Sequence, residues 1–121
     1  MKITEIAFSC YAVTDFARAR AFYEGVLELT VNPARPNFPY GGIWYDIGEQ
    51  MIHLLAVPNP DAGVVRPDHG GIDRHTALMV SDFDALIARL EKVGIPYSVS
   101  KSGRKALFCR DPDGNALEFM G

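Results

Sequence analysis

Three polar side chains occupy places where a β-strand would ordinarily be apolar. They are His53 within the run 51–57, His75 at the start of 75–80, and Glu118 within 116–120. Two imidazoles and a carboxylate suit a divalent ion such as Zn, Fe, Mn, Ni or Co, with coordination positions left open for substrate oxygens or water. Taken singly, a histidine in a strand is more often structural or surface-exposed, and a glutamate is usually solvated. The metal hypothesis therefore depends on the elements that position these residues.

We interpret the order of those elements as β-α-β-β-β in each half of the chain, with three strands of the first half located. Residue types and hydrophobic periodicity predict the following strands and helices: strand 3–13, helix 16–27, strands 43–47 and 51–57, then strand 75–80, helix 83–93, and strands 97–100, 105–109 and 116–120. Asp15 and Asp82 precede the two helices as predicted N-caps, and Gly94 is a predicted helix stop. The proline- and glycine-rich segment 58–74 is predicted to connect the halves as a linker or lid.

The two halves also repeat in sequence. Val13-Thr14-Asp15-Phe16 returns 67 residues later as Val80-Ser81-Asp82-Phe83, and an offset of 65 places His53 on Glu118. Related positions in two such modules could converge on one concave sheet face. The first-half counterpart of His75 is Phe8, whose side chain cannot ligate a metal.

Composition excludes several classes of protein. The 121 residues are 48% hydrophobic and 22% charged, with a net charge of −3, which is typical of a single folded domain. No basic run favours nucleic acid, and no apolar run approaches the roughly 20 residues of a membrane span. We therefore expect a cytoplasmic protein with no nucleic-acid or membrane partner. Cys10 and Cys109 lie in strand-like runs and are predicted to be buried thiols.

The motifs resemble a known family. Phe22-Tyr23-Glu24-Gly25-Val26-Leu27, the second-half strand that begins at His75, and Asp111-Pro112-Asp113-Gly114-Asn115-Ala116-Leu117-Glu118 look like the vicinal oxygen chelate superfamily of glyoxalases, bleomycin-resistance proteins and extradiol dioxygenases. The resemblance implies an α+β fold with two tandem βαβββ modules that form an open, cup-shaped mixed sheet. It implies one domain over 1–121, with module one at about 1–57, a connecting loop at about 58–74 and module two at about 75–121. Whether the modules pair within one chain or between chains stays open.

The resemblance also implies a site. Its four ligand positions fall on Phe8, His53, His75 and Glu118, so three ligands remain for a divalent ion (Zn, Ni, Mn, Fe or Co), with Glu118 as ligand or general base. We expect a metal-dependent enzyme whose ion chelates two neighbouring oxygens of a small molecule. Its class would be that of a lyase, isomerase, transferase or dioxygenase. We also expect the protein to be a homodimer. The alternative is a metal-free protein that sequesters an organic ligand, as bleomycin-resistance proteins do. Weaker pocket candidates are Phe8, Trp44, Tyr45, Phe108 and Arg104.

Overall fold

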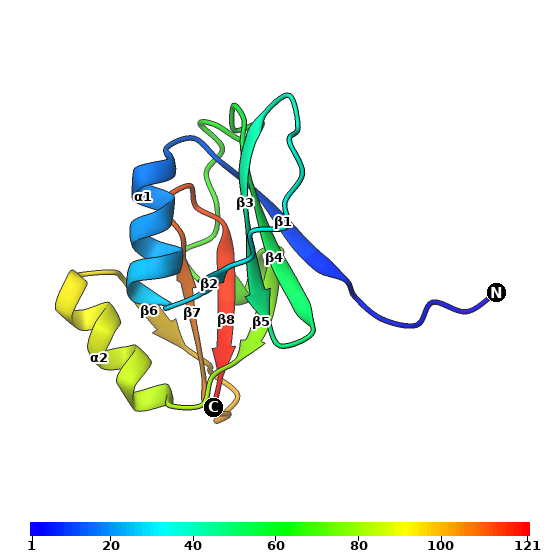
Figure 1. Cartoon of the computed structure of the whole chain (residues 1–121). Coiled ribbons are helices and arrows are strands. Elements are labelled where there is room, and N and C mark those ends of the chain that lie inside the picture. Colours follow the sequence, from blue (N-terminus) through cyan, green and yellow to red (C-terminus); the bar gives the residue numbers. More distant parts are fainter. The chain divides into compact units, whose positions relative to one another are not determined.

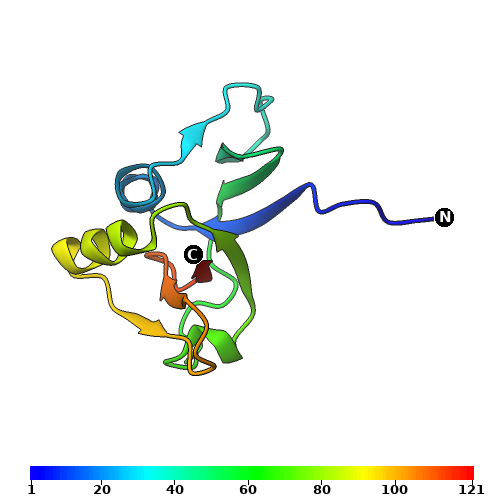
Figure 2. The same ribbon diagram turned by 90° about the horizontal axis from the view of Figure 1, so that it is seen from below.

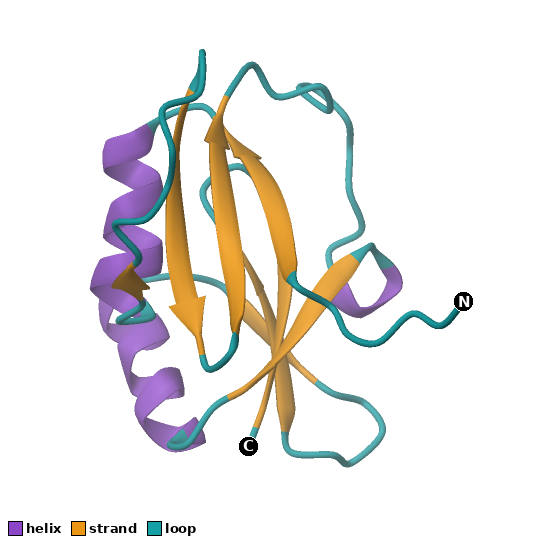
Figure 3. Cartoon of the chain, turned by 45° about the vertical axis from the view of Figure 1, so that its right-hand side comes forward, coloured by secondary structure: helices purple, strands orange, loops and turns teal.

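The computed structural model describes all 121 residues, and they form two compact units, Met1–Pro60 and Asp61–Gly121 (Figure 1). The first unit contains β1 (Phe8–Val13), α1 (Phe16–Arg20), the π-helical turn η1 (Ala21–Val26), β2 (Thr30–Val31), β3 (Gly41–Ile47) and β4 (Gln50–Ala56). The second contains the 3-10 turn η2 (Gly70–Ile72), β5 (His75–Met79), α2 (Phe83–Val93), β6 (Tyr97–Val99), β7 (Ala106–Arg110) and β8 (Ala116–Met120). The predicted order of two βαβββ modules is confirmed, and Figure 3 distinguishes their helices from their strands.

The first unit is built on a four-stranded mixed sheet in the order β1-β4-β3-β2. Strand β1 runs parallel to β4, and the other pairs are antiparallel. The core contains Val13, Tyr23, Tyr45 and Leu54, which are fully buried, and each such apolar side chain contributes roughly 1.5–3 kcal/mol. The Tyr23 and Tyr45 rings stack with their centroids 5.9 Å apart, so the helix covers the Tyr45 face of the sheet.

The first helix keeps its predicted position but changes its winding. Asp15 is the N-cap, accepting a hydrogen bond from the Arg18 backbone N–H at 3.1 Å, as predicted. After Arg20 the α-helix continues as η1, where the Leu27 N–H donates to the Phe22 carbonyl five residues back. Figure 2 views this helix down its axis. The apolar stripe of the sequence is compatible with either winding, so periodicity alone could not identify the π-helical turn.

Strand β1 begins later than the sequence predicted. Residues 1–7 lie outside any strand, and the Ile3 and Ile6 side chains are exposed. Pairing with β4 starts at Phe8 opposite Met51, because β4 itself starts only one residue earlier, after the Gly48-Glu49 turn. Residues 3–7 include strand-forming types, but no strand pairs with them. The two-residue strand β2 is too short to give a sequence signal.

The second unit repeats this plan, with its sheet in the order β5-β8-β7-β6. Helix α2 spans the residues predicted for it, with Asp82 accepting from the Ala85 N–H at 3.0 Å and Gly94 as a left-handed C-cap with φ 75°. Its buried residues Phe83, Leu86 and Leu90 join the core of Leu107 and Leu117. The caps and the apolar stripe of α2 thus agree with the sequence prediction.

The strand registers show that the halves are structural repeats. In the first unit, Phe8 lies opposite Met51. An offset of 67 relates Phe8 to His75, and an offset of 65 relates Met51 to Ala116. His75 and Ala116 also lie opposite each other. Across the hairpins, Trp44 lies opposite His53, and Phe108 lies opposite Glu118. Phe8, Trp44 and His53 therefore hold the same places in unit one as His75, Phe108 and Glu118 hold in unit two.

Candidate functional site

In the second unit, His75 and Glu118 are brought together. His75 opens β5 and Glu118 lies on the neighbouring strand β8, opposite Ala77. The His75 Nε2 and Glu118 Oε2 atoms are 3.1 Å apart, and the Glu118 side chain is only 7% exposed. A carboxylate at this degree of burial needs a positive partner, because charge removed from water is costly when unpaired.

The other ring nitrogen of His75 fixes its tautomer. His75 Nδ1 is 2.8 Å from the carbonyl oxygen of Asp73, and because a carbonyl only accepts, Nδ1 carries the proton. In the neutral ring Nε2 then presents a lone pair toward a carboxylate oxygen. Two acceptors at this separation need a proton or a metal cation between them. A histidine held this way, with Nδ1–H on a backbone carbonyl, is the usual orientation of a metal-ligating imidazole.

Arg104 and Phe108 complete the surroundings of this pair. The Arg104 Nη2 donates to Glu118 Oε1 at 2.7 Å, so the arginine occupies one carboxylate oxygen and leaves Oε2 to face His75. The Phe108 ring meets the His75 ring edge-on, with centroids 5.5 Å apart. Both residues were predicted as pocket candidates, and both contact the proposed ligands of this unit.

In the first unit, His53 lies between two aromatic rings. Phe8 of β1 stacks on it at 3.9 Å and Trp44 of β3 at 4.5 Å, each nearly parallel to the imidazole. His53 is buried, and its Nε2 atom has no hydrogen-bond partner. Burial, and then the positive charge of Arg35, lower the pKa of His53 below the ordinary histidine value. The ring is therefore held neutral with an unused nitrogen.

The structure places the remaining predicted site residues in different surroundings. His53 belongs to the first unit, whereas His75 and Glu118 belong to the second, and the structure contains no group of three His, Cys, Asp or Glu side chains that could hold a metal ion. Tyr45 departs from the pocket prediction, because it is fully buried on the helix-covered face and donates to Glu24 Oε2 at 2.8 Å. Because successive side chains of a strand point to opposite faces of the sheet, Tyr45 and Trp44 of β3 lie on opposite faces.

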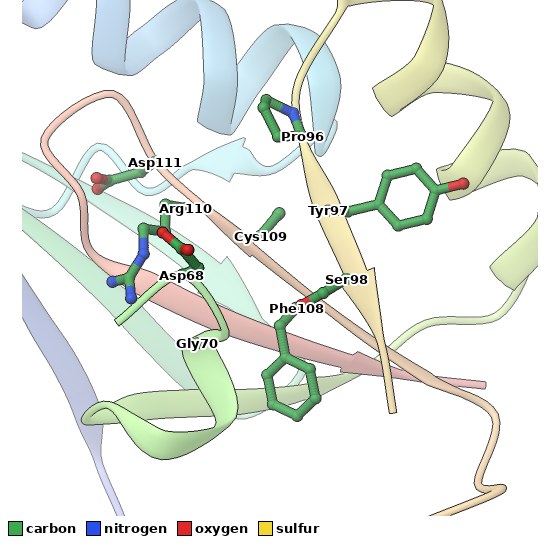
Figure 4. A pocket seen from close by; sticks show the side chains of 9 residues that line it. All are labelled: Asp68, Gly70, Pro96, Tyr97, Ser98, Phe108, Cys109, Arg110 and Asp111. Carbon is green, nitrogen blue, oxygen red and sulfur yellow. The ribbon is translucent and has the colours of Figure 1, made fainter. Parts of the chain in front are cut away.

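The second unit has a cavity of about 330 Å³ beside β6 and β7, shown in Figure 4. Two charged residues of its wall, Arg110 and Asp111, are already paired: Arg110 donates to Asp73 Oδ2 and to the carbonyls of Pro67 and Gly114, and Asp111 accepts from the backbone N–H of Asp113 and Asn115. Such groups stabilise the turn that leads into β8. They leave little unused hydrogen-bonding capacity for a ligand.

A second cavity, of about 260 Å³, lies in the first unit and is lined by Arg35 and Trp44 among others. Arg35 was not among the predicted pocket residues, and the available signal was the surrounding composition: an arginine between prolines, followed by aromatic residues and Gly41-Gly42. The Asp73 carbonyl that orients His75 gave no signal, because backbone groups are the same at every residue.

The comparisons with known proteins define the class. Residues 2–119 match the family model of the Glyoxalase/Bleomycin resistance protein/Dioxygenase superfamily, and the chain belongs to this superfamily. It is 32% identical over 115 residues to the uncharacterized protein YaeR of Escherichia coli K12, covering 88% of this chain and 87% of that protein.

Solved structures share the fold. A Bacillus anthracis protein of the glyoxalase family superposes with a TM-score of 0.75 at 27% identity, covering 98% of this chain and 95% of that one. TnmS3, an antibiotic binding protein from Streptomyces sp. CB03234, superposes with a TM-score of 0.70 at 19% identity, covering 99% and 97%. The fold thus occurs in a protein that binds an antibiotic as well as in a glyoxalase family protein. No helix of this chain is long and apolar enough to cross a bilayer.

Proposed function

We propose that the protein is a divalent-metal-dependent enzyme acting on a small oxygenated molecule, with His53, His75 and Glu118 as the metal ligands. The observation that carries the proposal is the His75 geometry: Nδ1 is tied to the Asp73 carbonyl, and Nε2 faces the buried Glu118 carboxylate. That arrangement prepares two donors for one cation. Superfamily membership supports the same reading.

The residues fit a divalent ion chemically. His53 has a buried Nε2 without a partner and a lowered pKa, which favours the neutral ring, and a neutral imidazole keeps a lone pair on one of its two nitrogens. Nitrogen and carboxylate donors in this ratio suit Zn, Ni, Mn, Fe or Co. When bound, such an ion would polarise two neighbouring oxygens of a substrate and stabilise developing negative charge. Arg104 holds the Glu118 carboxylate in place, and Glu118 is the residue positioned to accept a proton if it is not fully used as a ligand.

The test is metal content by mass spectrometry on tag-free protein, followed by calorimetric titration of the metal-free form with Mn, Fe, Co, Ni and Zn. We expect binding near one ion per chain, with affinity reduced at least tenfold by His75→Ala, since loss of groups that ligate or orient at metal sites typically has effects of this size or larger. Binding that His75→Ala leaves unchanged would refute the assignment.

His69→Ala is the matched control, because it removes a histidine from the same unit. His69 Nδ1 accepts from the Gly71 N–H at 2.9 Å and takes no part in the proposed ligand set. We expect metal affinity within twofold of the wild type in this variant. Equal losses in His69→Ala and His75→Ala would indicate a general effect on the fold.

A second candidate, a metal-free protein that sequesters an organic ligand, is favoured by Phe8. Its half-exposed ring replaces a potential ligand and stacks on His53, extending an aromatic surface with Trp44. Saturable binding of a cationic or amphipathic compound by metal-free protein, unchanged when metal is restored, would support this function. Absence of binding across a drug panel would count against it.

We further propose that the working form is a homodimer. Large apolar side chains remain exposed on the second unit, among them Met79 and Val99. These two residues lie on β5 and β6, the two edge strands of the sheet, and an edge strand is a surface that a partner subunit can cover.

A further inference from the structure

One loop arginine differs from the others in having no acidic partner. Arg66 and Arg74 pair with Asp61, Arg66 also with Asp73, and Arg104 pairs with Glu118. Arg35 makes no ion pair; its Nη2 donates only to the Tyr40 carbonyl, at 3.0 Å. Its positive charge is therefore uncompensated within the first unit.

The guanidinium of Arg35 is nevertheless held firmly. Its central carbon lies 5.0 Å from the Phe38 ring centroid and 6.0 Å from that of Tyr40, within the range of cation–π attraction. A Cβ added at Gly42 would lie 2.5 Å from Arg35 Nη2 and 2.6 Å from the Leu54 carbonyl oxygen. Only glycine leaves the space that the guanidinium occupies, so the position of Arg35 is built into β3.

This guanidinium lines the 260 Å³ cavity of the first unit together with Trp44, Asn32, Val31 and Arg20. No acidic side chain lines the cavity, and Arg35 Nε is a buried donor without an acceptor. Asn32 is already engaged, its side-chain amide donating to Asp46 at 2.9 Å. The polar groups of this cavity that have no partner are thus positively charged hydrogen-bond donors.

The cavity is also adjacent to the proposed chemistry. Gly42 and Trp44 alternate onto the same face of β3, and Trp44 stacks on His53 of the neighbouring strand. A ligand group held by Arg35 would therefore lie beside the aromatic stack that contains a proposed metal ligand.

We propose that Arg35 and Trp44 form a subsite for the carboxylate of a small ligand, with Arg35 binding the carboxylate and Trp44 contacting the adjoining apolar or planar group. The planar guanidinium matches a carboxylate more closely than a lysine ammonium would. The inference deepens the proposed function by naming the substrate class, a small carboxylic acid, and rests on that function only for the role of His53.

The chain offers a direct probe, because Trp44 is its single tryptophan. Trp44 fluorescence and calorimetry would be followed while full-length protein, freed of metal and dialysed free of chelator, is titrated with phenylacetate. Phenylacetamide, which has the same shape without the charge, is titrated in parallel. We expect saturable binding of phenylacetate, and binding of phenylacetamide at least tenfold weaker.

Three variants distinguish the contribution of Arg35 from a general effect of the protein's charge. Arg35→Gln is expected to weaken phenylacetate binding about tenfold or more, the loss typical of one charge-assisted interaction, and Arg35→Lys to restore it only in part. Arg74→Gln removes the same charge from an exposed arginine of the second unit and is expected to change the affinity less than twofold. Circular dichroism and thermal melting of each variant verify that the fold is retained.

Three results would overturn the subsite: equal affinity for phenylacetate and phenylacetamide, equal loss in Arg35→Gln and Arg74→Gln, or no saturation by wild type up to about 10 mM, tenfold above a Kd of about 1 mM. Because this titration uses metal-free protein, its failure leaves the metal proposal standing. Conversely, a failed metal titration leaves the carboxylate subsite standing.

Discussion

At the residue scale, His75 and His53 differ in what holds their rings. A backbone carbonyl orients His75, whereas two aromatic side chains hold His53. The orientation of His75 therefore depends on the path of the chain at Asp73, and that of His53 depends on Phe8 and Trp44. Substitution of Phe8 would thus act on His53 without affecting the tautomer of His75.

The two cysteines are predicted to differ sharply in reactivity. Burial, and then the charge of Asp111, raise the pKa of Cys109 to about 12, whereas Cys10 is exposed, with a pKa raised to a lesser degree by partial burial. At pH 8 only about one Cys109 thiol in ten thousand would be a thiolate. Iodoacetamide should therefore label Cys10 and leave Cys109 unmodified in the native protein, as read by peptide mass mapping. Comparable labelling of both without denaturant would contradict the structure.

Glu24 gives a pH dependence of stability. Its hydrogen bond from Arg20 at 2.7 Å, and then that from the Tyr45 hydroxyl, lower the pKa of Glu24 below its ordinary value. A carboxylate with a lowered folded-state pKa stabilises the fold above the unfolded-state pKa and loses that contribution as the pH falls through the folded-state pKa. Glu24→Gln should therefore be less stable than wild type near pH 7.

The difference in unfolding free energy between Glu24→Gln and wild type should narrow as the pH falls to about 3. Urea unfolding across this range measures it. Glu49→Gln, at the exposed β3–β4 turn, serves as control and should show no such narrowing. A difference that stayed constant with pH would show that Glu24 acts by packing and not by charge.

Single residues show where sequence reasoning succeeds and fails. Asp15 and Asp82 were identifiable because N-capping is a local interaction over three residues. The exposure of Cys10 and the burial of Tyr45 were not, because both residues lie in strands whose two faces look alike in sequence until the position of the helix is known. The stacking of Phe8 on His53 joins residues 45 positions apart, and no local pattern reports it.

At the element scale, two glycines should respond to substitution with opposite signs. Gly94 ends α2 with φ 75°, and although a Cβ there would meet no atom within 4 Å, the left-handed backbone costs an alanine about 1–2 kcal/mol. Gly25 lies within the η1 turn without a positive φ and with equal space, so Gly25→Ala should be neutral or stabilising by up to about 1 kcal/mol. Urea unfolding of both variants tests this, and destabilisation by Gly25→Ala equal to that by Gly94→Ala would contradict it.

Among the elements, α2 and β8 match their predicted bounds, because caps and a turn with Gly114 define their ends chemically. Strand β1 was overextended because strand propensity does not show where a partner strand stops. Strand β2 was not located because two residues carry no periodicity. The errors therefore lie where an element's end depends on its partner and not on its own residues.

At the scale of the whole molecule, the proposed ligands are drawn from both units. A divalent ion bound by His53, His75 and Glu118 should therefore raise the unfolding temperature reported by Trp44 in unit one. A metal at 100 times its Kd adds about 2.7 kcal/mol, which corresponds to several degrees for a chain of this size. His75→Ala, a change in unit two, should abolish the shift seen at Trp44. A shift that persists in this variant would place the metal elsewhere.

The proposed homodimer is tested by light scattering coupled to size exclusion. We expect twice the chain mass of 13.3 kDa, with an exposed edge strand such as β5 at the interface. Met79→Glu places a charge on the edge strand β5 and should shift the mass toward a single chain, whereas Lys92→Glu on the outer side of α2 should not. A mass of one chain for the wild type at micromolar concentration would contradict the proposal.

The two repeats differ in the connection that carries Arg35. Residues 32–40, nine in all, join β2 to β3, whereas residues 100–105, six in all, join β6 to β7. The second repeat shows that a shorter connection is enough to close the module, so the sheet does not depend on the extra length. Surface connections tolerate such insertions while the frame beneath them is retained. A repeated architecture thus lets the loop of one copy differ in length and in the ligand groups it carries, while both copies keep the same strand order.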